Sequence, residues 1–402
     1  MKVKIKKGAA KGEITAPPSK SIAHRLLIAA ALSEGVSTVR AVSKCEDAQA
    51  TMDCLKALGA RFEIHGNDVT VYGTNIKKSN PQQTLFCRES GSTLRFLIPL
   101  AMLSGNRAVF EGADGLMRRP MTVYETLSAE KKLFYRKEKN QITVCGPLQS
   151  GKYQLPGDVS SQFVSGLLFA LPLLEGDSVL RLTASIESRS YINLTISALR
   201  TFGVSVLWTD ENTLHIKGGQ VYHPADVAVE GDASGAAFPD ALNLFGGAVK
   251  VNGLNPNSIQ GDAVYPKLFA ELDGGTPTIS VQDCPDLAPV LFAVAAAKHG
   301  ATFLDTKRLM IKESNRAEAM AEELRKFGTE VCVNENSVVI NPKAFHAPSA
   351  MLSGHNDHRI VMALSVLCTV TGGCIDGAEA ISKSYPSFFD DWKHLGIEVQ
   401  EQ

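Results

Sequence analysis

Apolar residues recur at helical spacing in three stretches of the chain, and each stretch ends on the same short pattern. The pattern is a leucine, two further residues, an apolar residue and a glycine, found at Leu55–Gly59, Leu199–Gly203 and Leu324–Gly328. Ahead of it, apolar residues fall three or four positions apart and so line one face of a helix. A glycine in this place is typical of a helix that ends in the left-handed conformation. We therefore predict three helices that end at these glycines.

Each predicted helix is followed by two alternating runs of apolar and polar residues, joined by a polar turn. After Gly59 these runs are Phe62-Glu-Ile and Val69-Thr-Val, and similar runs follow Gly203 and Gly328. Alternation with period two predicts strands, so the repeated unit is helix, strand, turn, strand. Weaker copies near 127–144, 268–281 and 392–399 bring the count to about six units. Six units in 402 residues predict an α/β fold of two domains with three units each.

The balance of charges, the placement of the cysteines and the length of the apolar runs exclude several classes of protein. The 41 basic residues nearly balance the 42 acidic ones, so any anion site must be local, and we expect no nucleic acid partner. The eight cysteines contain no Cys-x-x-Cys pair, which predicts reduced thiols and neither disulfides nor a zinc site. The longest apolar runs, Leu287–Ala297 and Ile360–Val370, are shorter than the roughly 20 residues that a membrane span needs. We expect a soluble, cytoplasmic protein without a membrane partner.

Several catalytic motifs are absent from the chain. It has no Gly-x-x-x-x-Gly-Lys-Ser/Thr phosphate loop, no Gly-x-Gly-x-x-Gly after a strand, no Gly-x-Ser-x-Gly and no His-Glu-x-x-His. Nucleotide hydrolysis, dinucleotide chemistry, acyl-serine catalysis and zinc hydrolysis therefore lose support. His355 and His358 lack a third ligand at a matching spacing, so we expect no metal site.

The most informative charged stretch holds one carboxylate, Glu313, among Arg308, Lys312 and Arg316. If a helix begins at Lys312, Glu313 and Arg316 pair along it. A solvated stripe of ion pairs would explain one such stretch equally well. However, other short clusters with cations or hydroxyl groups lie mostly at predicted helix starts, where free N–H groups favour anions. They are Pro17–Arg25, Glu89–Arg95, Arg118–Pro120, Val159–Phe163 and Asn356–Arg359.

The clusters supply cations from both halves of the chain. The cations are Lys20, Arg25, Arg119, Lys312, Arg316, Arg359 and Lys383, and the acids that accompany them are few: Glu313, Asp286 and Asp232. A cleft between two domains would gather these groups around a substrate with several negative charges. Such a set suits proton transfer on a phosphorylated, carboxylated substrate without a cofactor.

Along essentially its whole length, the chain resembles the 5-enolpyruvylshikimate-3-phosphate synthase (3-phosphoshikimate 1-carboxyvinyltransferase) family. The resemblance is carried, in order, by Lys20-Ser21…Arg25, Gly91 in Ser-Gly-Ser-Thr, Arg119-Pro120, Ser160-Ser-Gln162, Lys312-Glu-Ser-Asn-Arg316, Asn356-Asp-His-Arg359 and Lys383. It implies a two-domain inside-out α/β barrel of six βαβαββ units, three per domain. Residues 19–230 would form the N-terminal domain, on the shikimate 3-phosphate side. Residues 1–18 with 231–402 would form the C-terminal domain, on the phosphoenolpyruvate side, with the active site in the interdomain cleft.

The resemblance also implies a reaction. The enolpyruvyl group of phosphoenolpyruvate would move to the 5-hydroxyl of shikimate 3-phosphate by addition and elimination through a tetrahedral intermediate, with release of phosphate. This reaction belongs to the shikimate pathway, that is, to chorismate and aromatic amino acid biosynthesis. It implies no metal or organic cofactor, the two substrates as partners, and glyphosate as an inhibitor. We expect a monomer.

Two alternatives stay open from the residues. The nearest is UDP-N-acetylglucosamine enolpyruvyl transferase, which usually has a reactive cysteine in the loop before Arg119, whereas residues 112–119 contain none. The other is a non-catalytic anion-binding protein with degenerate repeats. That alternative predicts loss of the acids, yet Asp286 and Glu313 are both present.

The resemblance further implies residue roles. Shikimate 3-phosphate would contact Lys20, Ser21, Arg25, Ser160, Ser161, Gln162, Ser188, Asp286 and Lys312, with Tyr191 beside its ring. Phosphoenolpyruvate would contact Lys20, Gly91, Arg119, Gln162, Arg316, Arg359 and Lys383. Asp286, Glu313 and Lys20 would be catalytic. Asp286 would take the proton of the 5-hydroxyl, while Glu313 would protonate the methylene carbon and later remove a proton from the methyl group.

Overall fold

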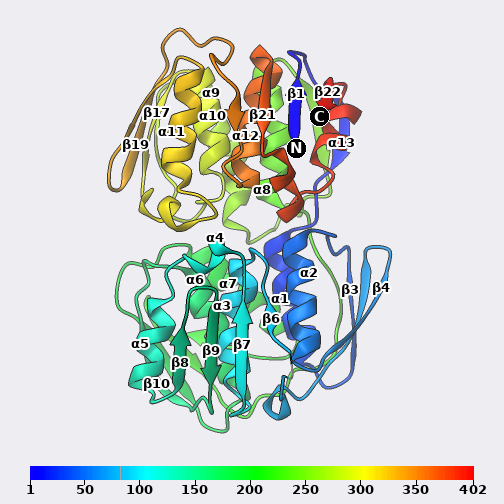
Figure 1. Cartoon of the computed structure of the whole chain (residues 1–402), viewed down its shortest axis with the longest axis vertical. Helices are drawn as coiled ribbons and strands as arrows, with labels where there is room; N and C mark the ends of the chain where they lie inside the picture. The colour runs from blue at the N-terminus through cyan, green and yellow to red at the C-terminus, as the bar shows by residue number, and fades with distance from the viewer. Residues whose placement is uncertain (82) are drawn as a thin grey trace. The chain divides into compact units, whose positions relative to one another are not determined.

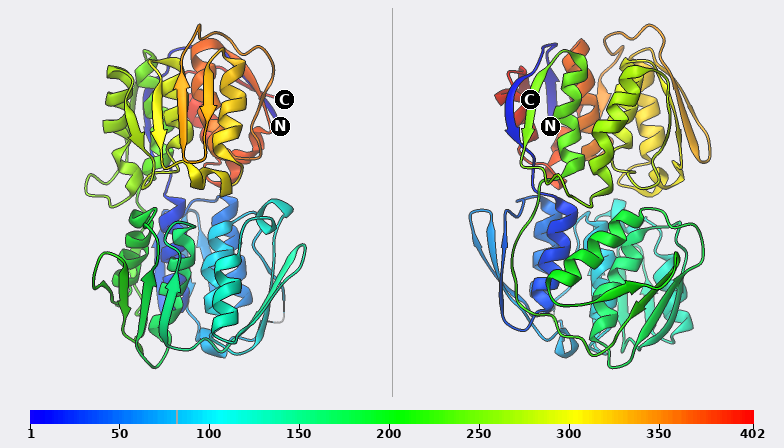
Figure 2. Two further views of the ribbon diagram at one scale, coloured as in Figure 1. Left: turned by 90° about the vertical axis from the view of Figure 1, so that its left-hand side faces the viewer. Right: turned by 180° about the vertical axis from the view of Figure 1, so that it is seen from behind.

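The computed structural model describes residues 1–81 and 83–402. The chain divides into two compact units, each with its own apolar core. The N-terminal unit is Lys20–Val229, and the C-terminal unit is Met1–Ser19 with Glu230–Gln402. Both ends of the chain lie in the C-terminal unit, where the first strand pairs with the last (Figures 1 and 2). No helix in the described part of the chain is long and apolar enough to cross a membrane.

The N-terminal unit holds three four-stranded sheets with one common strand order. The sheets are β14-β3-β5-β4, β6-β7-β9-β8 and β10-β11-β13-β12. In each sheet the first two strands are parallel and the last two form an antiparallel hairpin. The elements are α1 (Lys20–Leu32), β3 (Val36–Arg40), α2 (Glu46–Ala57), β4 (Arg61–His65), β5 (Asp68–Tyr72), β6 (Leu85–Phe86), α3 (Gly91–Ala101), β7 (Arg107–Glu111), α4 (Asp114–Met117), α5 (Thr122–Glu130), β8 (Phe134–Lys137), β9 (Gln141–Cys145), β10 (Gly151–Leu155), α6 (Ser161–Ala170), β11 (Ser178–Leu182), α7 (Arg189–Thr201), β12 (Val206–Trp208), β13 (Thr213–Ile216) and β14 (Asp226–Ala228).

The C-terminal unit also holds three sheets, but they are less regular. The sheet β16-β17-β19-β18 repeats the order above, and in β20-β21-β1-β22 the N-terminal strand supplies one strand of the closing pair. The sheet of β2 and β15 has two strands, because the chain runs from α9 directly into β16 without a hairpin. The elements are β1 (Lys2–Ile5), β2 (Lys11–Thr15), α8 (Ala233–Ala241), β15 (Ala248–Asn252), α9 (Tyr265–Gly274), β16 (Thr278–Ser280), α10 (Ala288–Ala297), β17 (Ala301–Leu304), α11 (Arg316–Lys326), β18 (Glu330–Val333), β19 (Ser337–Asn341), β20 (Leu352–Ser353), α12 (His358–Thr371), β21 (Gly373–Asp376), α13 (Phe388–His394) and β22 (Val399–Glu401).

Helices occupy the inside of each unit and sheets the outside. Helices α3, α6, α10 and α12 are buried along nearly their whole length, because they are apolar on all sides and offer no face to solvent. They pack on other helices, α3 on α6 and α10 on α12. A strand such as β5 instead alternates, with Val69 and Val71 buried between more exposed residues. Figure 1 shows the result in the C-terminal unit, where α10 and α12 lie between β17 and β1.

The three predicted helix ends are confirmed. Helices α2, α7 and α11 end just before Gly59, Gly203 and Gly328, whose φ angles are 109°, 81° and 84°. In α2 the Gly59 N–H donates to the Lys56 carbonyl at 2.9 Å and the Ala60 N–H to the Leu55 carbonyl at 3.0 Å. This is the Schellman motif, and it satisfies carbonyls that the helix end would leave without donors.

A fourth helix, α5, has the same ending with a lysine in place of glycine. Lys132 has a φ of 56°. Its N–H donates to the Ala129 carbonyl at 3.3 Å, and the Leu133 N–H donates to the Ser128 carbonyl at 2.8 Å. Because a Cβ disfavours this conformation by about 1–2 kcal/mol, the lysine is strained where the other helices have glycine.

We predict that Lys132→Gly stabilises the protein. Removing the Cβ relieves the strain, and the greater freedom of glycine in the unfolded chain offsets part of the gain. The free energy of unfolding should rise by about 0.5–1 kcal/mol, measured by urea denaturation. Lys131→Gly is the matched control, because Lys131 has a right-handed conformation. An equal stabilisation by both variants would contradict the explanation.

Candidate active site

Asp286 is the point at which three predicted cations of the C-terminal unit meet. Its Oδ1 accepts hydrogen bonds from Lys312 Nζ at 3.1 Å and Arg316 Nη1 at 2.8 Å, and its Oδ2 from Arg359 Nη2 at 3.1 Å. Asp286 lies just before α10, whereas Arg316 begins α11 and Arg359 lies in the first turn of α12. The fold therefore joins three helix starts that are far apart in the sequence.

Arg316 is the most buried cation of this cluster, with 1% of its surface exposed. Its Nε lies 2.8 Å from Asp357 Oδ2, and its Nη2 lies 3.3 Å from Asp357 Oδ1 and 2.7 Å from Glu313 Oε2. Burial alone would lower the pKa of Arg316, but Asp357, Glu313 and Asp286 raise it above its ordinary value. The guanidinium is therefore held fixed and fully charged.

The helix considered for the pairing of Glu313 with Arg316 does not begin at Lys312. Helix α11 begins at Arg316, and Asn315 caps it by accepting a hydrogen bond from the Glu318 N–H at 3.4 Å. Lys312 follows a short 3₁₀ turn at Lys307–Ile311 and has an extended conformation. Asparagine is a strong helix cap, so the helix starts after it. The Glu313–Arg316 pair nevertheless forms, with Arg316 Nη2 2.7 Å from Glu313 Oε2.

Arg359 and Lys383 complete this cluster. Arg359 Nη2 donates to Ser234 Oγ at 2.9 Å, and Ser234 Oγ donates to Asp232 Oδ1 at 3.0 Å, so Asp232 orients the serine and caps α8. Lys383 ends the 3₁₀ turn Ala378–Lys383, and its Nζ donates to the Asn356 carbonyl at 2.6 Å. The cations are thus anchored to neighbouring elements on several sides and are oriented before any ligand binds.

In the N-terminal unit, α1 carries Lys20, Ser21 and Arg25. Lys20 Nζ pairs with Asp47 Oδ2 at 3.0 Å. Arg25 is 2% exposed and donates to three neutral acceptors, namely Thr195 Oγ1 at 2.8 Å and the carbonyls of Ser21 at 2.7 Å and Tyr191 at 3.0 Å. Burial lowers the pKa of Arg25 to about 10, so the guanidinium stays charged near neutral pH. No carboxylate is among these three acceptors, so its positive charge is available to an anion.

Gly91, the first residue of α3, lies against two guanidinium groups. A Cβ at this position would lie 2.9 Å from Arg119 Nη1, 3.0 Å from Arg95 Nη1 and 3.5 Å from Gln162 Oε1. Arg95 Nη1 donates to Gln162 Oε1 at 2.6 Å, and Gln162 Nε2 donates to Ser92 Oγ at 3.0 Å. Two guanidinium groups beside a helix N-terminus form a site suited to an anion.

The predicted serines lie at two other helix starts of this unit. Ser160 caps α6 by accepting from the Gln162 N–H at 3.3 Å, and Ser161 begins that helix. Ser188 precedes α7 with a φ of 57°, and Tyr191 lies in the first turn of α7. Their role as substrate contacts stays a prediction.

A buried chain of hydrogen bonds ties α1 and α2 to the start of α3. His24 Nδ1 lies 2.7 Å from Thr51 Oγ1, which lies 2.6 Å from Thr93 Oγ1, and Thr93 donates to Ser90 Oγ at 2.8 Å. Burial, helped by Lys20 and Arg25, lowers the pKa of His24 well below its usual value, so the ring is neutral. Ser90 caps α3, so this network supports the position of Gly91.

Sequence reasoning left out four residues that orient the site: Asp47, Arg95, Ser234 and Asp357. A local signal existed for two of them. Arg95 lies one helical turn after Gly91, and Asp357 precedes α12 at a capping position. Asp47 and Ser234 carry no such signal, because their partners Lys20 and Arg359 are distant in the sequence.

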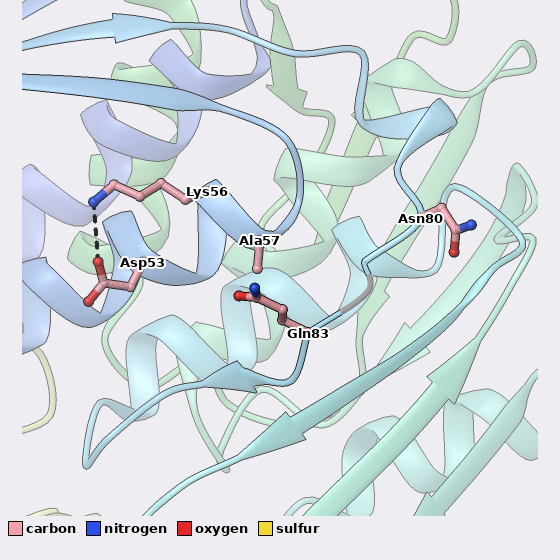
Figure 3. A pocket seen from close by; sticks show the side chains of 5 residues that line it. All are labelled: Asp53, Lys56, Ala57, Asn80 and Gln83. Atoms are coloured by element: carbon pink, nitrogen blue, oxygen red, sulfur yellow. Dashed lines mark hydrogen bonds and ion pairs between the residues drawn. The ribbon is translucent and has the colours of Figure 1, made fainter.

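One surface hollow of the N-terminal unit is separate from these clusters (Figure 3). It has a volume of about 460 Å³ and is lined by Asp53, Lys56, Ala57, Asn80 and Gln83. Asp53 pairs there with Lys56 at 3.4 Å and with Arg88 at 3.0 Å. None of the predicted site residues lines the hollow, so it is not the candidate site.

Comparison with known proteins identifies the family. The profile of the EPSP synthase (3-phosphoshikimate 1-carboxyvinyltransferase) family matches residues 5–392. The chain belongs to the EPSP synthase family. A 3-phosphoshikimate 1-carboxyvinyltransferase from Clostridium kluyveri is 40% identical over 97% of this chain and 96% of its own length, and one from Clostridium acetobutylicum is 37% identical over 99% and 98%.

Solved structures show the same fold. Two structures of EPSP synthase from Acinetobacter baumannii align over 100% of both chains, with TM-scores of 0.79 and 0.80 at 24% identity. The predicted α/β fold and family are confirmed, and so is the predicted function, enolpyruvyl transfer in the shikimate pathway. The alternative of a UDP-N-acetylglucosamine enolpyruvyl transferase is not favoured.

We predict that Asp357→Ala strongly destabilises this EPSP synthase family member. Asp357 is fully buried, and its removal leaves the buried Arg316 without its bidentate partner. Loss of one partner of a buried pair costs about 3–5 kcal/mol, which urea denaturation would measure. Glu330→Ala is the control, because Glu330 and Lys343 form an exposed pair worth about 0–1 kcal/mol. Similar losses for both variants would contradict the assignment.

Proposed function

We propose that the predicted site residues of the two units together bind the two substrates of the enolpyruvyl transfer. Shikimate 3-phosphate is held by the N-terminal unit, with Asp286 and Lys312 beside its reacting hydroxyl. The residues for it are Lys20, Ser21, Arg25, Ser160, Ser161, Gln162, Ser188, Asp286 and Lys312. Phosphoenolpyruvate is held by Lys20, Gly91, Arg119, Gln162, Arg316, Arg359 and Lys383.

The observation that carries the proposal is the convergence of Lys312, Arg316 and Arg359 on Asp286. A carboxylate with three cationic donors is a poor base, and Glu313 is likewise held by Arg316 at 2.7 Å. Phosphoenolpyruvate competes for Arg316 and Arg359, and shikimate 3-phosphate competes for Lys312. When substrate anions take over these donors, Asp286 and Glu313 regain proton affinity. Substrate binding therefore releases Asp286 and Glu313 from these ion pairs, so that both acids can carry protons.

In the addition step, the 5-hydroxyl oxygen of shikimate 3-phosphate attacks C2 of phosphoenolpyruvate and its proton passes to Asp286. Glu313 gives a proton to C3, which becomes a methyl group, and a tetrahedral intermediate results. In the elimination step, Glu313 takes a proton back from that methyl group as the bond from C2 to the phosphate oxygen breaks. Asp286 gives its proton to the departing phosphate, so both acids return to their starting state. Lys20, Arg119 and Lys383 stabilise the negative charge of the departing phosphate.

The substrate assignment is tested by phosphate release from phosphoenolpyruvate. We expect release with shikimate 3-phosphate and none with UDP-N-acetylglucosamine. Asp286→Asn and Glu313→Gln should each lower kcat by about 10²–10⁴-fold while substrate binding persists, because each removes a proton carrier. Glu318→Gln, an exposed acid in the first turn of α11, is the control and should leave kcat unchanged. Release with UDP-N-acetylglucosamine, or full activity in both site variants, would overturn the proposal.

We also predict that Gly91→Ala weakens phosphoenolpyruvate binding. The added Cβ displaces the guanidinium ends of Arg119 and Arg95, which are flexible enough to move without unfolding the helix. The KM for phosphoenolpyruvate should rise roughly tenfold, and inhibition by glyphosate, which we expect at the same site, should weaken with it. Gly115→Ala is the matched control, because a Cβ at Gly115 would meet no other part of the chain within 4 Å. An unchanged KM in Gly91→Ala would remove Gly91 from the site.

A further inference from the structure

The turn that precedes the helix of Arg359 has an unusual backbone. The Asp357 N–H donates to the Gly354 carbonyl at 2.8 Å, which closes a four-residue turn. Its two central residues, His355 and Asn356, have φ angles of 47° and 52°. Turns with two positive φ angles normally contain glycine, because a Cβ disfavours that conformation. This turn has no glycine at its two central positions, and contacts from outside the turn support it.

The support comes from Glu323, a fully buried carboxylate on α11. Its Oε1 lies 2.9 Å from His355 Nε2, and its Oε2 accepts from the Ser353 N–H at 3.0 Å. Lys326 Nζ lies 2.8 and 2.9 Å from the two oxygens. Burial alone would raise the pKa of Glu323, but the hydrogen bonds from His355 and Lys326 lower it. The carboxylate is ionised and can only accept, so His355 donates through Nε2.

A metal ion does not explain this cluster. Glu322, Glu323 and His355 lie close enough to one another to hold an ion. However, the ammonium of Lys326 contacts both oxygens of Glu323 and already supplies the compensating positive charge. The group is an ion-pair cluster in which Glu323 joins the turn to α11.

The supported turn carries two contacts of the candidate site. Its Asn356 carbonyl accepts from Lys383 Nζ at 2.6 Å, and Asp357, at its end, binds Arg316 through Nε at 2.8 Å. Helix α11 thus holds the turn twice, through Arg316 at its first residue and through Glu323 two turns later. A tilt of the turn would move both Lys383 and Arg316.

We propose that His355 and Glu323 are positioning residues for the phosphoenolpyruvate-binding cations Lys383 and Arg316. They act through the Gly354–Asp357 turn and touch no substrate themselves. The inference rests on the proposed function, in which these two cations bind phosphoenolpyruvate.

The test uses variants that lose the contact between residue 355 and Glu323 but do not strain the backbone of the turn. His355→Gly removes the contact with Glu323 but suits a positive φ, so the variant should fold with a Tm close to that of the parent. His355→Asn also tolerates this conformation and lacks the reach to Glu323. In both variants the KM for phosphoenolpyruvate should rise roughly tenfold, while kcat and the KM for shikimate 3-phosphate change less than about twofold.

A rescue variant and a control variant test whether the effect is specific to the contact between His355 and Glu323. His355→Gln can donate an amide hydrogen bond to Glu323 and should recover part of the lost affinity. His215→Asn removes another histidine–carboxylate pair, with Asp177 at 3.6 Å in the N-terminal unit, and should change neither KM. An unchanged KM for phosphoenolpyruvate in both His355→Gly and His355→Asn would overturn the inference, as would equal effects on both substrates together with a large fall in Tm.

A separate variant distinguishes this inference from the proposed function. Lys383→Ala should raise the KM for phosphoenolpyruvate more than either His355 variant does. If Lys383→Ala leaves that KM unchanged, the proposed binding site is wrong. If Lys383→Ala raises the KM and the His355 variants do not, the site stands and only the positioning role of His355 fails.

Discussion

The burial of Arg316 is the constraint on which the C-terminal unit depends. A guanidinium that is 1% exposed must be compensated by nearby negative charge, and Asp357, Glu313 and Asp286 supply it. Because these acids stand at the starts of different helices, the requirement also sets where α10, α11 and α12 begin relative to one another. The contacts that compensate the buried charge of Arg316 therefore involve the same acids as the proposed reaction. Two of the acids that neutralise Arg316 without substrate, Glu313 and Asp286, are those that we propose carry protons once substrate anions take their place.

In the N-terminal unit, Lys20 pairs with the carboxylate of Asp47, but neutral acceptors orient two buried arginines. Arg25 is held by a hydroxyl and two carbonyls, and Arg95 by the amide of Gln162. Neutral acceptors orient a guanidinium without cancelling its charge, so Arg25 keeps a positive potential that attracts anions. The neutral, buried His24 fits this arrangement, since a charge on its ring would be repelled by both Lys20 and Arg25. Arg316 is thus compensated by carboxylates, whereas the acceptors of Arg25 are neutral.

The repeated architecture explains why the clusters lie at helix starts. In each unit the apolar helices pack on one another and the sheets cover them (Figures 1 and 2). The sides of these helices are buried, which leaves their ends for polar side chains. Gly91, Ser161, Arg316 and Arg359 all lie in the first turn of a helix. There, free N–H groups add to the attraction for anions.

The sequence by itself determined the features that depend on a few neighbouring residues. The glycine-ended helices, the alternating strands and the family motifs were all readable, because helix caps and hairpins are made by hydrogen bonds between residues close in the chain. The tertiary structure decided what depends on distant segments. It showed that α11 begins at Arg316 and not at Lys312, that the sheet of β2 and β15 has two strands, and that Glu323 holds the turn at His355. It also brought Lys312, Arg316 and Arg359 into contact with Asp286. Charges interact through space, and the periodic pattern of the sequence does not indicate which distant residues will pair.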